Sequence, residues 1–98
     1  MEKEKTIKEF SYLGYTMRPH MRACLDRYIE TGLLPGHFLK AVICNDLFDA
    51  VGRADMDNLK NLSAFITYLY NEAPSECWGS KEAMFKWSER KKREEAKA

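Results

Sequence analysis

The chain has 98 residues, of which 45% are hydrophobic and 12% are aromatic, and its formal net charge at pH 7 is +1. This hydrophobic content excludes a disordered tail, while the balanced charge argues neither for nor against a nucleic-acid partner. Because a chain of this length buries only a modest core, we expect one domain over residues 1–98 that forms a homo-oligomer.

The cysteines and the first residues bear on the cellular compartment. The three cysteines, Cys24, Cys44 and Cys77, are odd in number and widely spaced, which favours free thiols in a reducing compartment over disulfides. Residues 1–9 are a charged run rather than a secretory signal, and no apolar stretch is long enough to span a bilayer. The sequence therefore predicts a cytoplasmic protein without a membrane partner.

Residues 1–15 form an N-terminal arm for which two structures remain open. Ile7 and Phe10 have the spacing of a short helix, whereas Phe10 and Tyr12 alternate as in a strand. The pattern does not decide between them.

Two helices are predicted after this arm. The first spans residues 18–31, because apolar residues recur at helical spacing, Pro19 fits the first turn and Gly32 supplies a stop. The second spans residues 35–54, with Pro35 in its first turn. Its apolar arc is wide enough for the central helix of a small bundle.

A third helix is predicted over residues 56–73, capped by the carboxylate of Asp55. A fourth begins at Lys81, with Ser80 as its cap, and continues into a solvated helical tail over residues 89–98. The predicted fold class is therefore all-α, a compact bundle of three to four helices.

The start of the second helix is a candidate anion site. The free amides that begin with Gly36 and His37 would lie there, and Lys40 follows one turn later. Arg18 and Arg22, four residues apart on one face of the first helix, would add cations. The alternative is an ordinary helix end, with Lys40 reaching past its neighbours to water.

The segment Trp78-Gly79-Ser80 is a second candidate. A loop tryptophan beside a flexible glycine and a hydroxyl donor is suited to stacking on a planar base and bonding its edge. The alternative is that Trp78 closes the core. Asn45 also has two possible roles, because its side-chain amide either recognises a ligand or links helices by hydrogen bonds.

Metal binding and catalysis have little support in the sequence. His20 and Cys24 are four apart on one helical face and Cys44, Cys77 or His37 would have to complete a set, but no paired-cysteine spacing supports a zinc site. The chain has no nucleophile elbow, no carboxylate pair with a histidine and no phosphate-binding loop. We therefore expect neither an enzyme nor a resident metal or cofactor.

Several spaced motifs resemble a widespread group of short proteins encoded by tailed bacteriophages. They are Arg18-Pro19-His20-Met21, Tyr28-Ile29-Glu30-Thr31-Gly32, Pro35-Gly36-His37-Phe38-Leu39, Asn45-Asp46-Leu47, Ala54-Asp55, Asn58, Asn71-Glu72-Ala73-Pro74, Trp78-Gly79-Ser80 and Trp87. The similarity covers about residues 17–87. The group is similar to compact oligomeric sponge proteins of the anti-CBASS or anti-Thoeris type, which sequester cyclic-nucleotide immune signals. The resemblance implies stoichiometric capture without cleavage in the host cytosol.

The leading hypothesis is thus a phage protein that binds an anionic cyclic nucleotide. Its candidate ligand-binding residues are Arg18, Arg22, Tyr28, Gly36, His37, Lys40, Asn45, Trp78 and Ser80. The alternative is a phage accessory protein that binds a host or phage protein and no small ligand. Nucleic-acid binding through the basic tail ranks last, because Glu94-Glu95 directly follows the positive residues 90–93.

Overall fold

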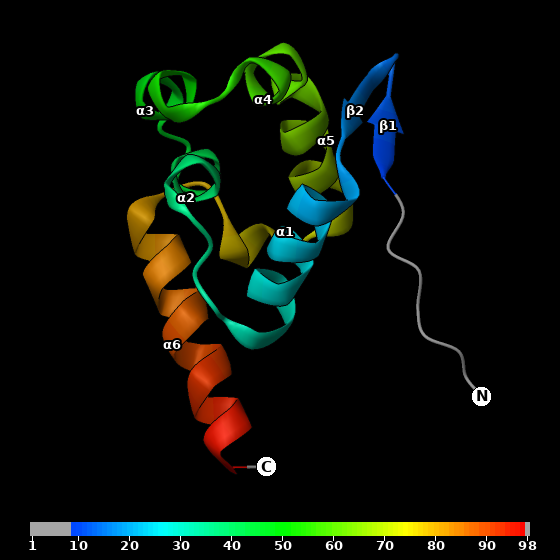
Figure 1. The fold of residues 1–98 in the computed structure, drawn as a ribbon. Coiled ribbons are helices and arrows are strands. Elements are labelled where there is room, and N and C mark those ends of the chain that lie inside the picture. Colours follow the sequence, from blue (N-terminus) through cyan, green and yellow to red (C-terminus); the bar gives the residue numbers. More distant parts are fainter. Residues whose placement is uncertain (1–8, 98) are drawn as a thin grey trace, which may run out of the picture.

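The computed structural model describes residues 9–97, which form a mostly helical chain with a small hairpin (Figure 1). In chain order its elements are β1 (Phe10–Tyr12), β2 (Tyr15–Met17), α1 (Pro19–Thr31), α2 (His37–Ile43), α3 (Leu47–Arg53), α4 (Met56–Lys60), α5 (Leu62–Glu72), the 3-10 turn η1 (Ser75–Cys77) and α6 (Lys81–Lys97). The predicted helical character is confirmed. The described residues contain six α-helices rather than three or four, together with two strands that the predicted class did not include.

In the described part of the N-terminal arm, the chain forms a β-hairpin rather than a helix. β1 and β2 pair antiparallel, with Tyr12 opposite Tyr15. The two residues between them have positive φ, 52° at Leu13 and 84° at Gly14, as in the tight turns that match strand twist. Residues 1–8 of the predicted arm lie outside the described residues.

The first helix is confirmed by α1. Gly32 ends it in the left-handed region with φ 81°, and its N–H donates to the carbonyl of Tyr28 at 2.8 Å. This glycine also touches α6, because the Ser88 hydroxyl donates to its carbonyl at 2.7 Å. Gly32 therefore both ends α1 and forms a close contact with α6.

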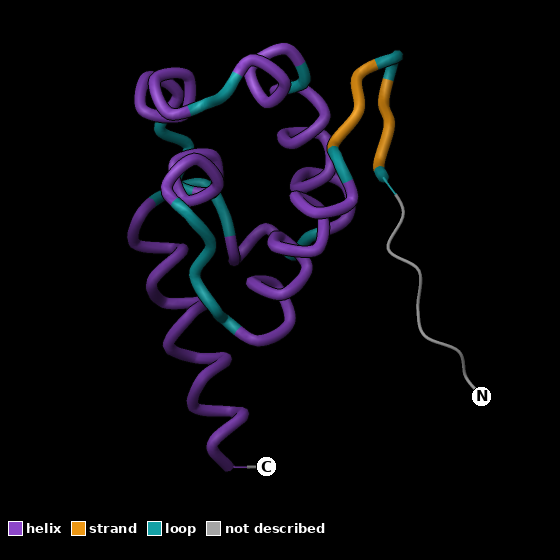
Figure 2. The backbone as a smooth tube through the Cα atoms, in the orientation of Figure 1, coloured by secondary structure: helices purple, strands orange, loops and turns teal. Residues whose placement is uncertain are grey.

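The single helix predicted over residues 35–54 is wrong. The chain forms α2 and α3 instead, separated by a short loop (Figure 2). Asn45 has φ 62°, a conformation that asparagine tolerates better than most residues, and the Asp46 carboxylate accepts from the Asp49 N–H at 3.2 Å. These two local preferences outweigh the continuous apolar pattern. Pro35 also lies before the helix, whose N-cap is Gly36.

The third helix begins as predicted but is interrupted. Asp55 accepts from the Asn58 N–H at 2.7 Å, which confirms the cap. The helix breaks at Asn61, whose side chain accepts from the Thr16 N–H at 2.8 Å and donates to the Asp57 carbonyl at 2.8 Å. These bonds fix the backbone where α4 gives way to α5 and attach the hairpin there.

The fourth helix is confirmed by α6. The Ser80 hydroxyl oxygen accepts from the Ala83 N–H at 3.0 Å, as expected of a cap. The helix runs to Lys97, and its end projects beyond the other helices (Figure 1). The predicted single domain includes residues 1–8 and Ala98, which lie outside the described residues, so it stays a prediction.

The core lies between α1, α2, α5 and α6. Its fully buried side chains, the largest first, are Tyr28, Phe65, Met17, Leu25, Ile43, Met84 and Cys77. Phe38 and Phe65 meet edge to face, with ring centroids 5.2 Å apart. Trp87 joins α6 to α1, because it is 5% exposed and its indole Nε1 donates to the Ile29 carbonyl at 3.1 Å.

Candidate functional site

A groove of about 680 Å³ lies between α2, α3 and the beginning of α6. The residues that give it chemical character are His37, Lys40, Asn45, Phe48, Lys81 and Phe85. Three of them, His37, Lys40 and Asn45, are among the residues predicted from the sequence. The short loop between α2 and α3 lets α3 pack beside α2, and residues of both helices line the groove.

Two lysines supply its positive charge. Within residues 9–97, neither Lys40 nor Lys81 forms an ion pair or a side-chain hydrogen bond. Burial raises the pKa of the Cys44 thiol, and the ammonium groups of Lys81 and Lys40 partly offset that rise. Both charges therefore lie close to Cys44, which also lines the groove.

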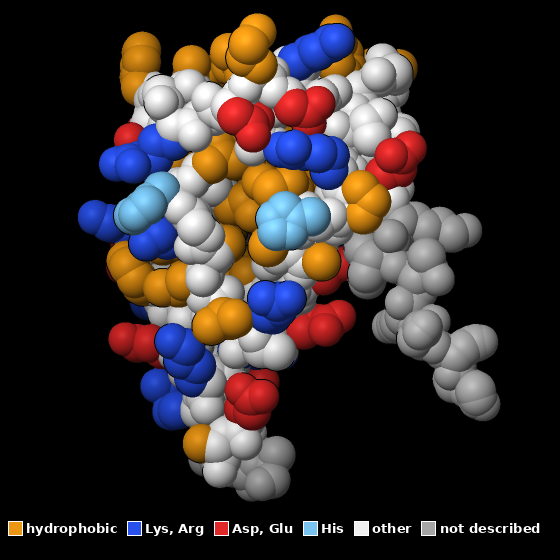
Figure 3. Space-filling model, in the orientation of Figure 1, with side chains coloured by type: hydrophobic (Ala, Val, Ile, Leu, Met, Phe, Trp, Pro, Cys, Tyr) orange, Lys and Arg blue, Asp and Glu red, His pale blue; other side chains and the backbone are white. Residues whose placement is uncertain are grey.

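Of the two acidic side chains of the groove, only Asp49 is paired with a cation among the described residues. Asp46 caps α3, and Asp49 accepts from the Arg53 Nε through both carboxylate oxygens at 3.1 Å. Lys, Arg and His side chains gather on the face over α2 and the upper part of α6 (Figure 3). Lys40 and Lys81 outnumber Asp46, the acidic groove residue without a cationic partner among residues 9–97, so the groove offers a ligand a net positive charge.

Aromatic surface lies beside these charges. Phe48 on α3 is 90% exposed, and Phe85 on α6 is also exposed. An exposed phenylalanine ring offers a flat apolar surface on which a planar group can stack. Sequence reasoning missed Lys81, Phe48 and Phe85, because they meet at one groove only through the packing of α6 near α2 and α3.

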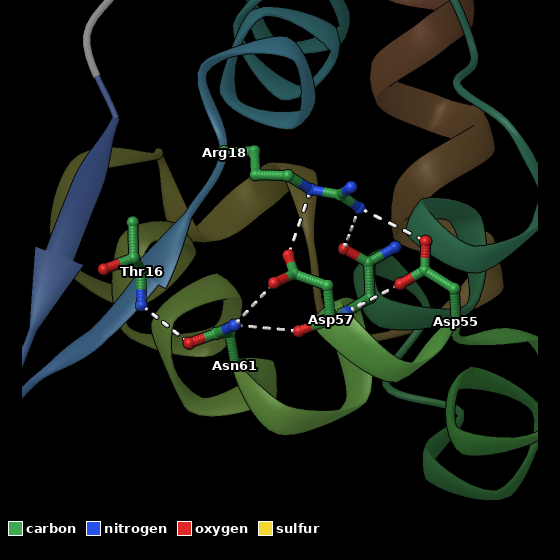
Figure 4. A network of polar contacts seen from close by, with 6 residues as sticks. Thr16, Arg18, Asp55, Asp57 and Asn61 are labelled. Carbon is green, nitrogen blue, oxygen red and sulfur yellow. Dashed lines mark hydrogen bonds and ion pairs between the residues drawn. The ribbon is translucent and has the colours of Figure 1, made fainter.

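Arg18 lies elsewhere, in a polar junction between the end of the hairpin and α4 (Figure 4). Its guanidinium reaches the Asp55 carboxylate at 3.3 Å, the Asp57 carboxylate at 3.0 Å and the Asn58 amide oxygen at 3.0 Å. The hydrogen bond from the backbone amide of Asn58, and to a lesser extent the contact with Arg18, hold the pKa of the Asp55 carboxyl below its usual value. This arrangement explains Arg18 as a link between distant segments.

Arg22 and Tyr28 are also outside the groove. Arg22 pairs with Asp26 at 3.7 Å and lies over the ring of Tyr68, 5.3 Å from its centroid. Tyr28 is fully buried and its hydroxyl donates to the Cys77 carbonyl at 2.8 Å. Burial raises the pKa of Tyr28.

The remaining predicted residues lie at helix ends. Gly36 is the exposed N-cap of α2, and Ser80 caps α6 immediately before the groove residue Lys81. The structure thus brings His37, Lys40 and Asn45 together, places Gly36 and Ser80 next to groove residues in the chain, and does not bring in Arg18, Arg22 or Tyr28.

Trp78 is half-buried against the core. Its ring is tilted against Tyr70 with centroids 6.1 Å apart, and the next residue, Gly79, donates its N–H to the Ile43 carbonyl at 2.8 Å. The indole Nε1 is buried without a hydrogen-bond partner among the described residues. Trp78 does not line the groove.

Trp78→Phe is expected to leave the free energy of unfolding unchanged within about 1 kcal/mol. The lost ring area is offset because a buried N–H without a partner disappears, and such a group costs about 1–3 kcal/mol. The matched variant Trp87→Phe removes an N–H that is bonded to Ile29, so it should be the more destabilising of the two. Urea unfolding of both variants checks this, and an equal loss would contradict it.

No protein-family model matches the chain, no curated protein matches it, and no solved structure matches it. Among residues 9–97, no three His, Cys, Asp or Glu side chains are grouped so that they could hold a metal ion. No helix in that part of the chain combines the length and the apolar character needed to cross a bilayer.

Proposed function

We propose that the protein binds a small anionic nucleotide in the groove between α2, α3 and α6. The observation that carries this proposal is the pair of unengaged lysines, Lys40 and Lys81, beside the exposed rings of Phe48 and Phe85. The volume of about 680 Å³ is within the usual range of small-molecule sites, about 300–1,000 Å³.

Each part of the groove would have a distinct role. The ammonium groups of Lys40 and Lys81 would form charge-assisted hydrogen bonds with phosphate oxygens. Phe48 or Phe85 would stack on the base, and the amide of Asn45 would donate to and accept from its edge. His37 would add a third donor at the groove.

The biological role that we propose follows from the resemblance to phage proteins. The ligand would be a cyclic-nucleotide immune signal of the host, and an oligomeric phage protein in the host cytoplasm would sequester it without cleaving it. Capture without cleavage requires that the ligand be recovered intact. Chromatography of a cyclic dinucleotide after prolonged incubation and denaturation of the protein tests this, and any linear product would contradict it.

Lys40→Ala is expected to weaken binding of such a nucleotide by about 1.5–3 kcal/mol, because one charge-assisted contact is lost. The fold should persist, since the lysine has no hydrogen bond or ion pair among the described residues. Lys92→Ala is the matched control, because Lys92 is exposed on α6 and does not line the groove.

Calorimetry with cyclic dinucleotides, cyclic trinucleotides and their linear forms measures the affinity of each variant. Equal affinities of Lys40→Ala and Lys92→Ala for a bound nucleotide would show that the site lies elsewhere. If the wild type binds none of these compounds, the nucleotide proposal is wrong and the protein-partner hypothesis takes its place.

A further inference from the structure

An apolar surface runs across α3, α4, α5 and the hairpin. One hollow lies between α3 and α5, and a second, of about 650 Å³, lies between α5 and the hairpin. The two hollows share Leu62 and Ile66, so they belong to one continuous surface. We call this surface the apolar face; its exposed apolar side chains are Tyr12, Leu13, Tyr15, Leu47, Leu59 and Ile66.

The apolar face leaves a continuous group of large apolar side chains in water. Its members are between 43% and 78% exposed. Contiguous exposed apolar patches of this kind usually mark sites of interaction with another protein. Hydrophobic side chains also project over α3 and α4 in the space-filling view (Figure 3).

Leu13, at the hairpin end of the apolar face, combines an unusual backbone conformation with high exposure. It occupies the tip of the hairpin with φ 52°, a position where asparagine, aspartate or glycine is favoured, and it is 78% exposed. A leucine here strains the turn and leaves its side chain in water. Contact with another apolar surface would offset both costs.

The charges on the apolar face indicate its partner. Lys60 lines the hollow at the hairpin end, and Asp46 lines the hollow at the α3 end. Within residues 9–97, neither side chain forms an ion pair. A two-fold rotation places the basic end of one copy against the acidic end of another, so the face is complementary to itself.

We propose that a second copy of the chain covers the apolar face, forming a two-fold symmetric dimer. Ile66 of each copy lies near the centre of the interface. At each of the two ends of the interface, Lys60 of one copy meets Asp46 of the other. Because Asp46 and Leu47 line the nucleotide groove as well, each copy borders the groove of its partner. The inference goes beyond the proposed ligand, and its test requires none.

Leu13→Asn separates the role of Leu13 in the dimer interface from its effect on the hairpin turn, because the substitution should weaken the dimer but stabilise the monomer. The variant should raise the thermal midpoint of the monomer, since asparagine suits the turn, and it should raise the dimer dissociation constant about tenfold or more, since two leucines leave the interface. Sedimentation velocity over about 1–100 µM measures the dissociation constant. Leu33→Asn, at an exposed leucine outside the apolar face, should leave it unchanged.

A second set of variants tests the proposed ion pair between Lys60 of one copy and Asp46 of the other. Lys60→Glu should weaken the dimer by placing two carboxylates together, and Asp46→Asn in that background should restore much of the loss. Asparagine keeps the N-cap of α3, so the rescue does not depend on refolding this helix. Lys86→Glu, on the exposed face of α6, is the control for net charge.

A wild-type protein that stays monomeric at about 100 µM would overturn the proposal. So would a dimer that Ile66→Glu does not dissociate, because the interface would then lie on another face. Failure to bind a nucleotide would leave these measurements unaffected, so the two proposals can fail separately.

Discussion

Trp87→Ala is expected to lower the free energy of unfolding by about 3–5 kcal/mol, which is the usual loss for a large aromatic side chain in a core. Trp87 is 5% exposed and fills the seam between α1 and α6. Its removal leaves a cavity and also takes the donor from the Ile29 carbonyl. Small domains are stable by only about 5–15 kcal/mol, so urea unfolding should show a large shift of the midpoint.

Phe85→Ala provides the control for this experiment. Phe85 lies on the same helix, two residues before Trp87, but it is exposed, so its truncation should cost far less. Comparable losses from the two variants would show that the seam between α1 and α6 is not a main source of stability.

Gly32→Ala is expected to cost about 2–5 kcal/mol, through two effects. A left-handed conformation costs a residue with a Cβ about 1–2 kcal/mol, and φ at Gly32 is 81°. The new Cβ would also lie 2.7 Å from the backbone oxygen of Ser88, and relieving such crowding adds about 1–3 kcal/mol. Thermal and urea unfolding measure the loss.

Gly52→Ala should act in the opposite direction. Gly52 lies within α3 in an ordinary helical conformation, and a Cβ there meets no atom within 4 Å. Alanine is about 1 kcal/mol better than glycine inside a helix, so this variant should be at least as stable as the wild type. Destabilisation by both substitutions would show that the effect of Gly32→Ala does not come from its special geometry.

The helix ends were the most predictable part of the fold. Asp55, Ser80 and Gly32 act as the sequence indicated, because a cap depends on a side chain and on amides only two or three residues away. The prediction of one helix over residues 35–54 was wrong for a related reason. The apolar repeat continues through Asn45, but the local preferences of asparagine and aspartate break it.

Long-range contacts could not be predicted. The bond from the Thr16 N–H to Asn61 joins residues 45 positions apart, and no local pattern marks either of them. The groove poses the same difficulty, since Lys40 and Lys81 belong to helices that are distant in sequence. Sequence reasoning found Lys40 because it interrupts an apolar helix, whereas Lys81 follows a cap where a charged residue is ordinary.

The burial of Cys77 has a consequence for chemical labelling. Cys77 is fully buried in η1, and burial raises the pKa of its thiol to about 11. Alkylating reagents attack the thiolate, so at neutral pH this residue reacts only when the surrounding core opens. Cys24 and Cys44 are half-buried. The rate at which Cys77 is alkylated therefore reports how often the core of the native protein opens, without any engineered probe.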